Sequence, residues 1–264
     1  MDEGDILLWK DQDAVRVLTL NRPKARNCLS MALMQALQGA LAEAAETDDV
    51  RAVVLAGSGP AFSSGHDLKE LTARRNDPDR GRAFFEETMR TCAETMLTIV
   101  RLPKPVIAAV NGIATAAGCQ LVATCDLAVA ATDARFATPG VNIGLFCSTP
   151  MVALSRNLSR KATMEMLLLG EMVEAEEALR LGLVNRVAEP DRVVNEAVAF
   201  GRKIASKPSR TLKIGKEAFY RQLEMPLDEA YRYTAGVMVE NMLDAEAEEG
   251  IGAFLDKREP QWPR

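Results

Sequence analysis

Histidine is the scarcest chemically useful residue in this 264-residue chain, and it occurs once, as His66. A single imidazole excludes histidine-rich metal sites and most Ser-His-Asp triads, so we expect no metal site. The five cysteines are scattered along the sequence, and no two of them have CxxC spacing. An odd number of unclustered cysteines predicts reduced, buried thiols and a cytoplasmic protein.

The chain also lacks a basic surplus and a long apolar run. Its net charge of −5 provides no general electrostatic attraction for nucleic acid or an anionic membrane. No uninterrupted apolar run approaches the roughly 18 residues that a membrane helix needs, and the acidic start has no signal-peptide pattern. The composition, with 48% hydrophobic and 26% charged residues, is typical of globular proteins. We therefore expect neither nucleic acid nor membrane as a partner.

Strand-like and helix-like segments alternate over most of the chain. Apolar runs predict short strands, listed here by residue number: 6–9, 14–20, 52–56, 126–130 and 183–187. Helical spacing of apolar residues predicts a helix from the N-cap Ser30 to about Glu46 and a longer one over about 82–100. The glycine-rich stretch 135–145 is expected to be irregular. Because helices alone follow residue 188, we predict an α/β core over 1–188 and a helical region over 189–264.

A run of very small residues near the middle of the chain is the first candidate site. Residues 108–121 begin as a buried strand, turn at Asn111 and Gly112, and open a helix near Ala116. The first N–H groups of a helix have no internal partner, and the helix dipole favours negative charge there. A second small-residue loop, residues 61–71, has the same layout about 50 residues earlier. Two such loops suit an oxyanion hole, although a tightly packed strand-to-helix junction gives the same pattern.

The ordered motifs carry a resemblance that extends over essentially the whole chain. They occupy residues 21–27, 63–70, 110–112, 118–126, 136–139 and 249–258. In this order they resemble the crotonase (enoyl-CoA hydratase/isomerase) superfamily. The resemblance implies an α/β spiral of ββα turns, two roughly perpendicular sheets and a C-terminal helical trimerisation region. It also implies a homotrimer or a dimer of trimers that binds an acyl-CoA thioester, with coenzyme A as part of the substrate and no separate cofactor.

The same resemblance assigns roles to individual residues. The backbone N–H groups of His66 and Ala117 would form the oxyanion hole for the thioester oxygen. The residues expected along the coenzyme A path are Lys24, Ala25, Ser64, His66, Asp67 and Leu68, and those expected to reach the coenzyme A of a neighbouring subunit are Phe254 and Lys257.

Two positions depart from the hydratase pattern. Hydratases of this superfamily use two glutamates to move protons, and here Gln120 and Gly140 occupy the corresponding positions. An amide can orient a water molecule or contact an acyl group, but it cannot exchange a proton at neutral pH. Other side chains are open as replacements, namely those of His66, Glu86, Glu87, Asn142, Cys147 and Ser148.

The sequence thus predicts an acyl-CoA-processing protein of the enoyl-CoA hydratase/isomerase type, a lyase or isomerase that stabilises a thioester enolate. We expect a role in fatty-acid or acyl-CoA metabolism. The missing glutamates keep two alternatives open. One is an acyl-CoA decarboxylase, since some decarboxylases of the superfamily carry Gly-His-Asp where this chain has residues 65–67. The other is a catalytically silent acyl-CoA-binding protein.

Overall fold

A computed structural model describes residues 5–263, and the first four residues, which begin the acidic start of the chain, lie outside that range. Most strands of the described chain form one six-stranded sheet in the order β1-β2-β3-β5-β7-β10. Its strands are β1 (Leu7–Gln12), β2 (Val15–Leu20), β3 (Ala52–Gly57), β5 (Val106–Val110), β7 (Leu127–Ala131) and β10 (Arg186–Ala188). The first two strands, predicted over 6–9 and 14–20, pair antiparallel as a hairpin, and the other pairings in this sheet are parallel.

A smaller four-stranded sheet has the order β4-β6-β8-β9. It contains β4 (Ala61–Ser63), β6 (Ile113–Thr115), β8 (Arg135–Ala137) and β9 (Val173–Glu174). Along the chain, β3 leads to β4, β5 to β6 and β7 to β8, and each pair is followed by a helix. This succession is the expected ββα turn, and the α/β fold is confirmed. The prediction that 135–145 is irregular was wrong, because β8 and a 3-10 helix (Pro139–Ile143) lie within it.

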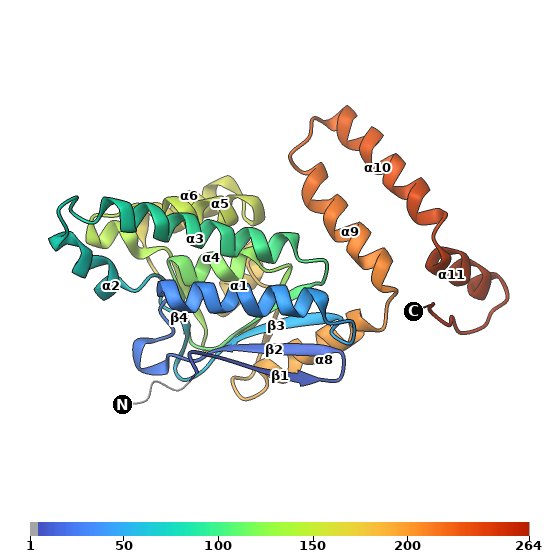
Figure 1. Ribbon diagram of the computed structural model, residues 1–264, viewed down its shortest axis with the longest axis horizontal. Coiled ribbons are helices and arrows are strands. Elements are labelled where there is room, and N and C mark those ends of the chain that lie inside the picture. The colour runs from blue at the N-terminus through green and yellow to red at the C-terminus, as the bar shows by residue number, and fades with distance from the viewer. Residues whose placement is uncertain (1–4, 264) are drawn as a thin grey trace.

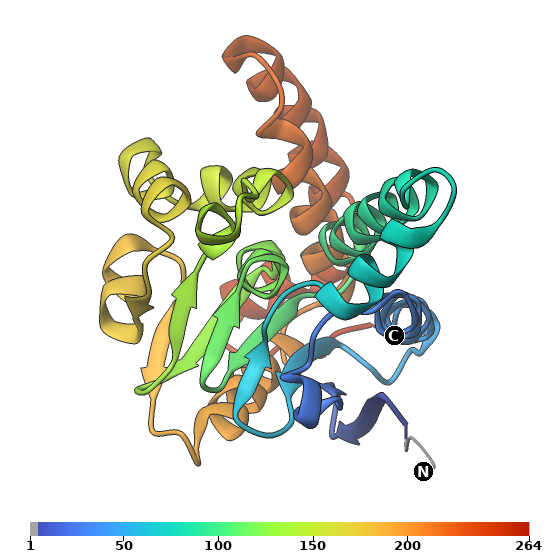
Figure 2. The same ribbon diagram turned by 90° about the vertical axis from the view of Figure 1, so that its left-hand side faces the viewer.

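Long helices cover the sheets (Figures 1 and 2). Helix α1 (Met31–Glu46) begins where the Ser30 side chain accepts the N–H of Leu33, as predicted, and it packs against α3 (Arg82–Arg101). The shorter helices of this region are α2 (Leu68–Ala73), α4 (Ala117–Thr124), α5 (Ser148–Asn157), α6 (Arg160–Leu169) and α7 (Ala175–Leu181). Every residue of β5 and of α4 is buried. The core therefore reaches the helix start that the sequence marked as a candidate site.

Helix α8 (Val193–Ala205) belongs to the predicted C-terminal region, yet it packs on the large sheet. Its Gly201 lies so close to the sheet that an added Cβ would be 3.1 Å from the Val15 side chain and 3.5 Å from that of Ile107. The helices that project from the body are α9 (Ser209–Gln222), α10 (Leu227–Met242) and α11 (Ala245–Leu255), as Figure 1 shows. The division of the chain after residue 188 stays a prediction.

The projecting helices are attached by a partly buried ion pair and expose apolar side chains. Lys216 of α9 donates to Asp126 at 2.7 Å, and Tyr220 donates to the same carboxylate at 2.9 Å. Several large apolar side chains of α10 and α11 are more than two-thirds exposed, namely Leu227, Tyr231, Phe254 and Leu255. Large apolar side chains exposed in this way on neighbouring helices are typical of protein–protein contact sites. None of the helices formed by residues 5–263 has the length and apolar character required to cross a membrane.

Candidate functional site

The two small-residue loops meet at the carboxyl ends of neighbouring strands. Strands β4 and β6 pair in parallel, so the loops that follow Ser63 and Thr115 leave the sheet side by side. A Cβ on Gly65 would lie 2.9 Å from the Ala116 Cβ, and a Cβ on Gly118 would lie 2.2 Å from the Ser63 carbonyl oxygen. Only glycine permits such close backbone approach. The structure therefore brings together the two loops that the sequence singled out.

The backbone N–H of His66 is left free by the way its loop is anchored. Leu29 donates its N–H to the Gly65 carbonyl at 2.7 Å and accepts the Asp67 N–H at 3.2 Å. In a parallel bridge of this kind the residue between the two bonds points its own N–H away from the partner. Accordingly, the His66 N–H has no acceptor within residues 5–263.

The backbone N–H of Ala117 is free because it begins α4. The first N–H groups of a helix have no acceptor inside the helix, and none is supplied to Ala117 by the described part of the chain. The preceding residue, Ala116, has φ 49° and ψ −118°, a conformation that glycine adopts readily and alanine does not. Backbone strain of this kind gathers at functional sites. His66 and Ala117 thus each present a backbone N–H without an acceptor in the described chain, and their role as an oxyanion hole stays a prediction.

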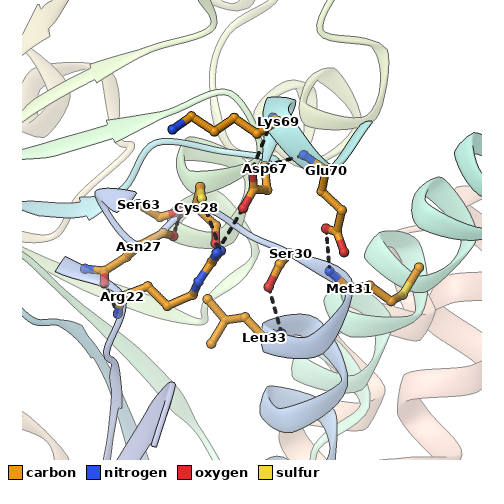
Figure 3. A network of polar contacts seen from close by, with 10 residues as sticks. All are labelled: Arg22, Asn27, Cys28, Ser30, Met31, Leu33, Ser63, Asp67, Lys69 and Glu70. Carbon is orange, nitrogen blue, oxygen red and sulfur yellow. Dashed lines mark hydrogen bonds and ion pairs between the residues drawn. The ribbon is translucent and has the colours of Figure 1, made fainter. Parts of the chain in front are cut away.

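A polar network holds the first loop in place (Figure 3). Arg22 donates to the Cys28 carbonyl at 2.7 Å and to the Asp67 carboxylate at 2.9 Å. Asp67 also accepts the N–H groups of Lys69 and Glu70, which caps the start of α2. Partial burial raises the pKa of Asp67, but the bonds from Arg22 and the helix start outweigh it and hold that pKa below its usual value. The ion pair between Arg22 and Asp67 thus holds the first loop in place at the residue that directly follows His66.

Asn27 connects the same loop to the strand before it. Its side chain is fully buried and donates to the carbonyls of Ser58 and Ala61 at 2.8 and 2.7 Å. The backbone carbonyl of Asn27 accepts a hydrogen bond from the Ser63 hydroxyl at 2.9 Å. The sequence analysis missed Asn27, Arg22 and Cys28 as site-supporting residues. Arg22 and Asn27 lie in the motif 21–27 that carries part of the resemblance, but nothing local in that motif shows that they hold the first loop.

The His66 side chain lies within the site without a hydrogen-bond partner. Neither ring nitrogen is accessible to solvent, and neither is paired by any residue in the range 5–263. Burial disfavours the charged imidazolium and lowers the pKa of His66 below its ordinary value of 6.5, and it outweighs the Leu29 backbone, which acts in the opposite direction. The imidazole is therefore mostly neutral at pH 7.

Gln120 lies one turn into α4 and is 4% exposed. The side-chain amide oxygen of Gln120, Oε1, is 3.9 Å from the thiol sulfur of Cys92 on α3. Burial raises the pKa of Cys92 to about 11, so the thiol is protonated and acts as the donor. The Gln120 amide nitrogen has no partner in the described chain and is not fully enclosed.

The other candidate acid–base side chains are poorly placed for proton transfer. Glu86 and Glu87 are 68% and 56% exposed and form ion pairs with Arg82 and Arg90, so they face solvent. Burial raises the pKa of the Cys147 thiol, which makes it a weak nucleophile. Two of the candidates, Asn142 and Ser148, are exposed. Within residues 5–263, no three His, Cys, Asp or Glu side chains are grouped to hold a metal ion.

The residues expected to contact coenzyme A fall into two groups. One group surrounds the loops: Lys24 is exposed on a 3-10 helix (Pro23–Ala25), Leu68 is half exposed, and Ser64 donates its N–H to the Arg26 carbonyl at 3.0 Å. This bond joins the loop that carries Lys24 and Ala25 to the first oxyanion loop. The other group, Phe254 and Lys257, lies at the far end of the projecting helices, away from α2 (Figure 1). One chain alone does not bring that group to the loops.

Comparison with known proteins gives a consistent result. Residues 10–264 match the family model described as Enoyl-CoA hydratase/isomerase. Rat (Rattus norvegicus) enoyl-CoA hydratase domain-containing protein 3, mitochondrial, is 46% identical over 253 residues, which cover 96% of this chain and 83% of that protein. Its name gives a mitochondrial location, so the expected cytoplasmic location is not confirmed.

Two solved structures have the same fold. An enoyl-CoA hydratase of Mycobacterium smegmatis superimposes with a TM-score of 0.93 at 53% identity, covering 98% of this chain and 99% of that one. Human enoyl coenzyme A hydratase domain-containing protein 3 superimposes with a TM-score of 0.92 at 46% identity, covering 98% of this chain and all of that one.

Proposed function

The chain belongs to the enoyl-CoA hydratase/isomerase family, and from this premise we propose that it is an acyl-CoA-processing enzyme that stabilises a thioester enolate. The observation that carries the proposal is the pair of free backbone N–H groups, at His66 and Ala117, on two loops in contact. When a thioester loses a group from its α-carbon, the electron pair moves into the carbonyl and negative charge develops on oxygen. Fixed N–H donors stabilise that charge, and removing one such donor typically costs about 10²–10³ in rate.

Water addition is not the reaction that this site favours. It needs a base for the water and an acid for the α-carbon, whereas residues 120 and 140 here are glutamine and glycine. A side chain on Gly140 would meet the Leu145 carbonyl oxygen at 2.7 Å and the Cys147 sulfur at 2.9 Å. The loop as folded therefore has no room for a carboxylate at this position.

Decarboxylation is the second candidate reaction, and the donor-rich, carboxylate-poor site favours it. The bond between the α-carbon and the carboxylate breaks, carbon dioxide leaves, and the electron pair forms the enolate held by the two N–H groups. A proton from water then completes the product. Because no base is required for bond breaking, the neutral His66 imidazole and the Gln120 amide are compatible with this step.

The ligand and the oligomer are part of the same proposal. The exposed positive side chain of Lys24, beside the first loop, suits the phosphates of coenzyme A. The exposed apolar side chains of α10 and α11 suit a contact with further copies of the chain, in a trimer or a dimer of trimers. In such an assembly Phe254 and Lys257 would reach a neighbouring subunit's coenzyme A.

Calorimetric titration with butyryl-CoA tests binding, and incubation with crotonyl-CoA tests hydration through loss of the conjugated-thioester absorbance. We expect micromolar or tighter binding and no hydration at an ordinary enzymatic rate of about 1–10³ s⁻¹. Release of carbon dioxide from malonyl-CoA or a substituted malonyl-CoA would support the decarboxylase. Hydration at an ordinary rate would contradict our reading of Gln120 and Gly140, and the absence of binding to any acyl-CoA would contradict the proposed function as a whole. Binding without turnover of crotonyl-CoA, malonyl-CoA or substituted malonyl-CoA would instead support a silent acyl-CoA-binding protein.

A further inference from the structure

The Gln120 amide is built into the site as an oriented hydrogen-bond donor. Gln120 is 4% exposed, and on its carbonyl side it meets the thiol of Cys92, which is itself fully buried. A thiol with its proton in place can donate only to the amide oxygen. The oxygen is therefore occupied, and the NH₂ group is the end of the amide left for a ligand.

Gln120 lies in the first turn of α4, the helix that begins with the free N–H of Ala117. Helical side chains lean toward the N-terminus of their helix, so that of residue 120 lies over the first turn. That turn begins at Ala117, and three residues advance a helix by about 4.5 Å. Because the side chain leans back along the helix, its amide can lie within about this distance of the Ala117 N–H along the helix axis, which is within the span of a three-carbon acyl unit from the thioester carbonyl to a substituent on C3.

We propose that the site selects acyl-CoA thioesters that carry a hydrogen-bond acceptor oxygen on C3, with Gln120 donating to that oxygen. Cys92 is a positioning residue, because it acts on the ligand only by orienting the Gln120 amide. The acceptor is the ketone of a 3-oxoacyl thioester or the carboxylate of a malonyl-type thioester. Both present the same oxygen to an amide donor, whereas a saturated acyl chain leaves a buried donor unpaired, which is costly. The inference rests on the proposed acyl-CoA function and names the substrate class of that same site.

Calorimetric titration of the full chain with three thioesters tests the inference. We expect acetoacetyl-CoA and malonyl-CoA to bind about ten-fold more tightly than butyryl-CoA, the difference that one well-formed hydrogen bond provides. Gln120→Leu and Gln120→Met should remove this preference: both should weaken acetoacetyl-CoA and malonyl-CoA binding, and butyryl-CoA, which no longer leaves an amide unpaired, should bind at least as tightly as to the unaltered chain. Gln120→Glu should bind malonyl-CoA more weakly than acetoacetyl-CoA, because two carboxylates then face each other.

The role of Cys92 has its own variants. Cys92→Val removes the thiol donor and should weaken acetoacetyl-CoA binding about three-fold, with butyryl-CoA unaffected, whereas Cys92→Ser retains a donor and should recover most of the loss. Cys125→Ala, a buried thiol at the other end of α4, is the matched control and should change neither affinity.

Equal binding of the three thioesters to the unaltered chain would overturn the inference and leave the proposed function intact. An equal loss for all three thioesters in both Gln120→Leu and Gln120→Met, with the melting temperature unchanged, would also overturn it. If no thioester binds to the unaltered chain, the proposed function itself fails.

Discussion

The two loops of the site present the same kind of donor but are held in place by different means. The first loop, residues 63–67, is fixed by side chains, since Arg22 and Asn27 bind it from a segment about 40 residues earlier. The second loop, which ends at Ala116 and leads into the first turn of α4, has no comparable set of side-chain bonds in the described chain. It is fixed by close backbone packing at Gly118 and by the Ala116 N–H, which donates to the Ala137 carbonyl at 2.9 Å, and its Ala116 has a positive φ.

This difference predicts different sensitivities. A polar network loses its effect when one partner is removed, and the loss depends on pH because a carboxylate takes part. A sterically packed loop tolerates a change in charge but not an added atom, because protein interiors are close-packed. The comparison between the loops is therefore open to test by variants that remove charge in one and add or remove a methyl group in the other.

The largest effect is expected for Gly118→Ala in the second loop. The added Cβ would lie 2.2 Å from the Ser63 carbonyl oxygen, so one of the two loops must move. We expect the free energy of unfolding to fall by about 3 kcal/mol or more, with loss of acyl-CoA binding in the folded fraction. Urea unfolding measures the first and calorimetry the second. Gly215→Ala on α9, where no atom lies within 4 Å of the added Cβ, is the matched control and should be neutral or slightly stabilising. Unchanged stability of Gly118→Ala would show that the loops are not packed as described.

The next effect is expected for Arg22→Met in the first loop. Removal of the guanidinium leaves the partly buried Asp67 carboxylate without its ion pair, and we expect a loss of about 1–3 kcal/mol in unfolding free energy at pH 7. The folded-state pKa of Asp67 lies below its unfolded value of 3.8, so its stabilising contribution is present above that pH and is lost as the pH falls through the folded value. Arg22→Met should show less of this acid-dependent loss in urea unfolding between pH 6 and pH 3.

A matched control for Arg22 is Arg90→Met, which breaks the ion pairs of an arginine that is 60% exposed on α3. Exposed ion pairs contribute little, and we expect a change below about 0.5 kcal/mol. Equal losses in the two variants would contradict a special role for the network of the first loop.

A smaller effect of opposite sign is expected for Ala116→Gly. Glycine relieves the strain of positive φ, worth about 1–3 kcal/mol, and costs about 0.5–1 kcal/mol in unfolded-state entropy, so we expect a net gain near 1 kcal/mol. Thermal unfolding measures the change. Ala199→Gly, at an exposed position inside α8, has ordinary helical geometry and should lose about 1 kcal/mol instead. If Ala116→Gly instead lost as much unfolding free energy as Ala199→Gly, the backbone of Ala116 would not be strained.

The smallest effect concerns protonation of His66. Because burial lowers its folded-state pKa below 6.5, its contribution to stability is present above pH 6.5 and declines as the pH falls through the folded value. Proton NMR reads this pKa without assignment, since His66 is the only histidine. We expect a midpoint below 6.5, and His66→Gln should flatten the dependence of melting temperature on pH in this range. A midpoint at or above 6.5 would contradict the buried, unpaired imidazole.

Much of the fold followed from patterns that are local in the sequence. Helical spacing and the Ser30 N-cap gave the limits of α1 closely, and the amphipathic stretch before Arg101 gave those of α3. The strand β8 was missed because three residues are too few to show a period of two. Its strand geometry comes from pairing with β6 and β9, which are distant in sequence.

The candidate site divides in the same way. The sequence by itself determined where the backbone can come close, through Gly65 and Gly118, and which acid–base groups are missing, through Gln120 and Gly140, because these depend only on which side chain a position carries. Only the tertiary structure decided which residues support the loops. The contacts of Arg22 with Asp67, of Asn27 with Ser63 and of Cys92 with Gln120 join positions 28 to 45 residues apart. No local pattern encodes such pairs, since they form only when the sheets and helices pack.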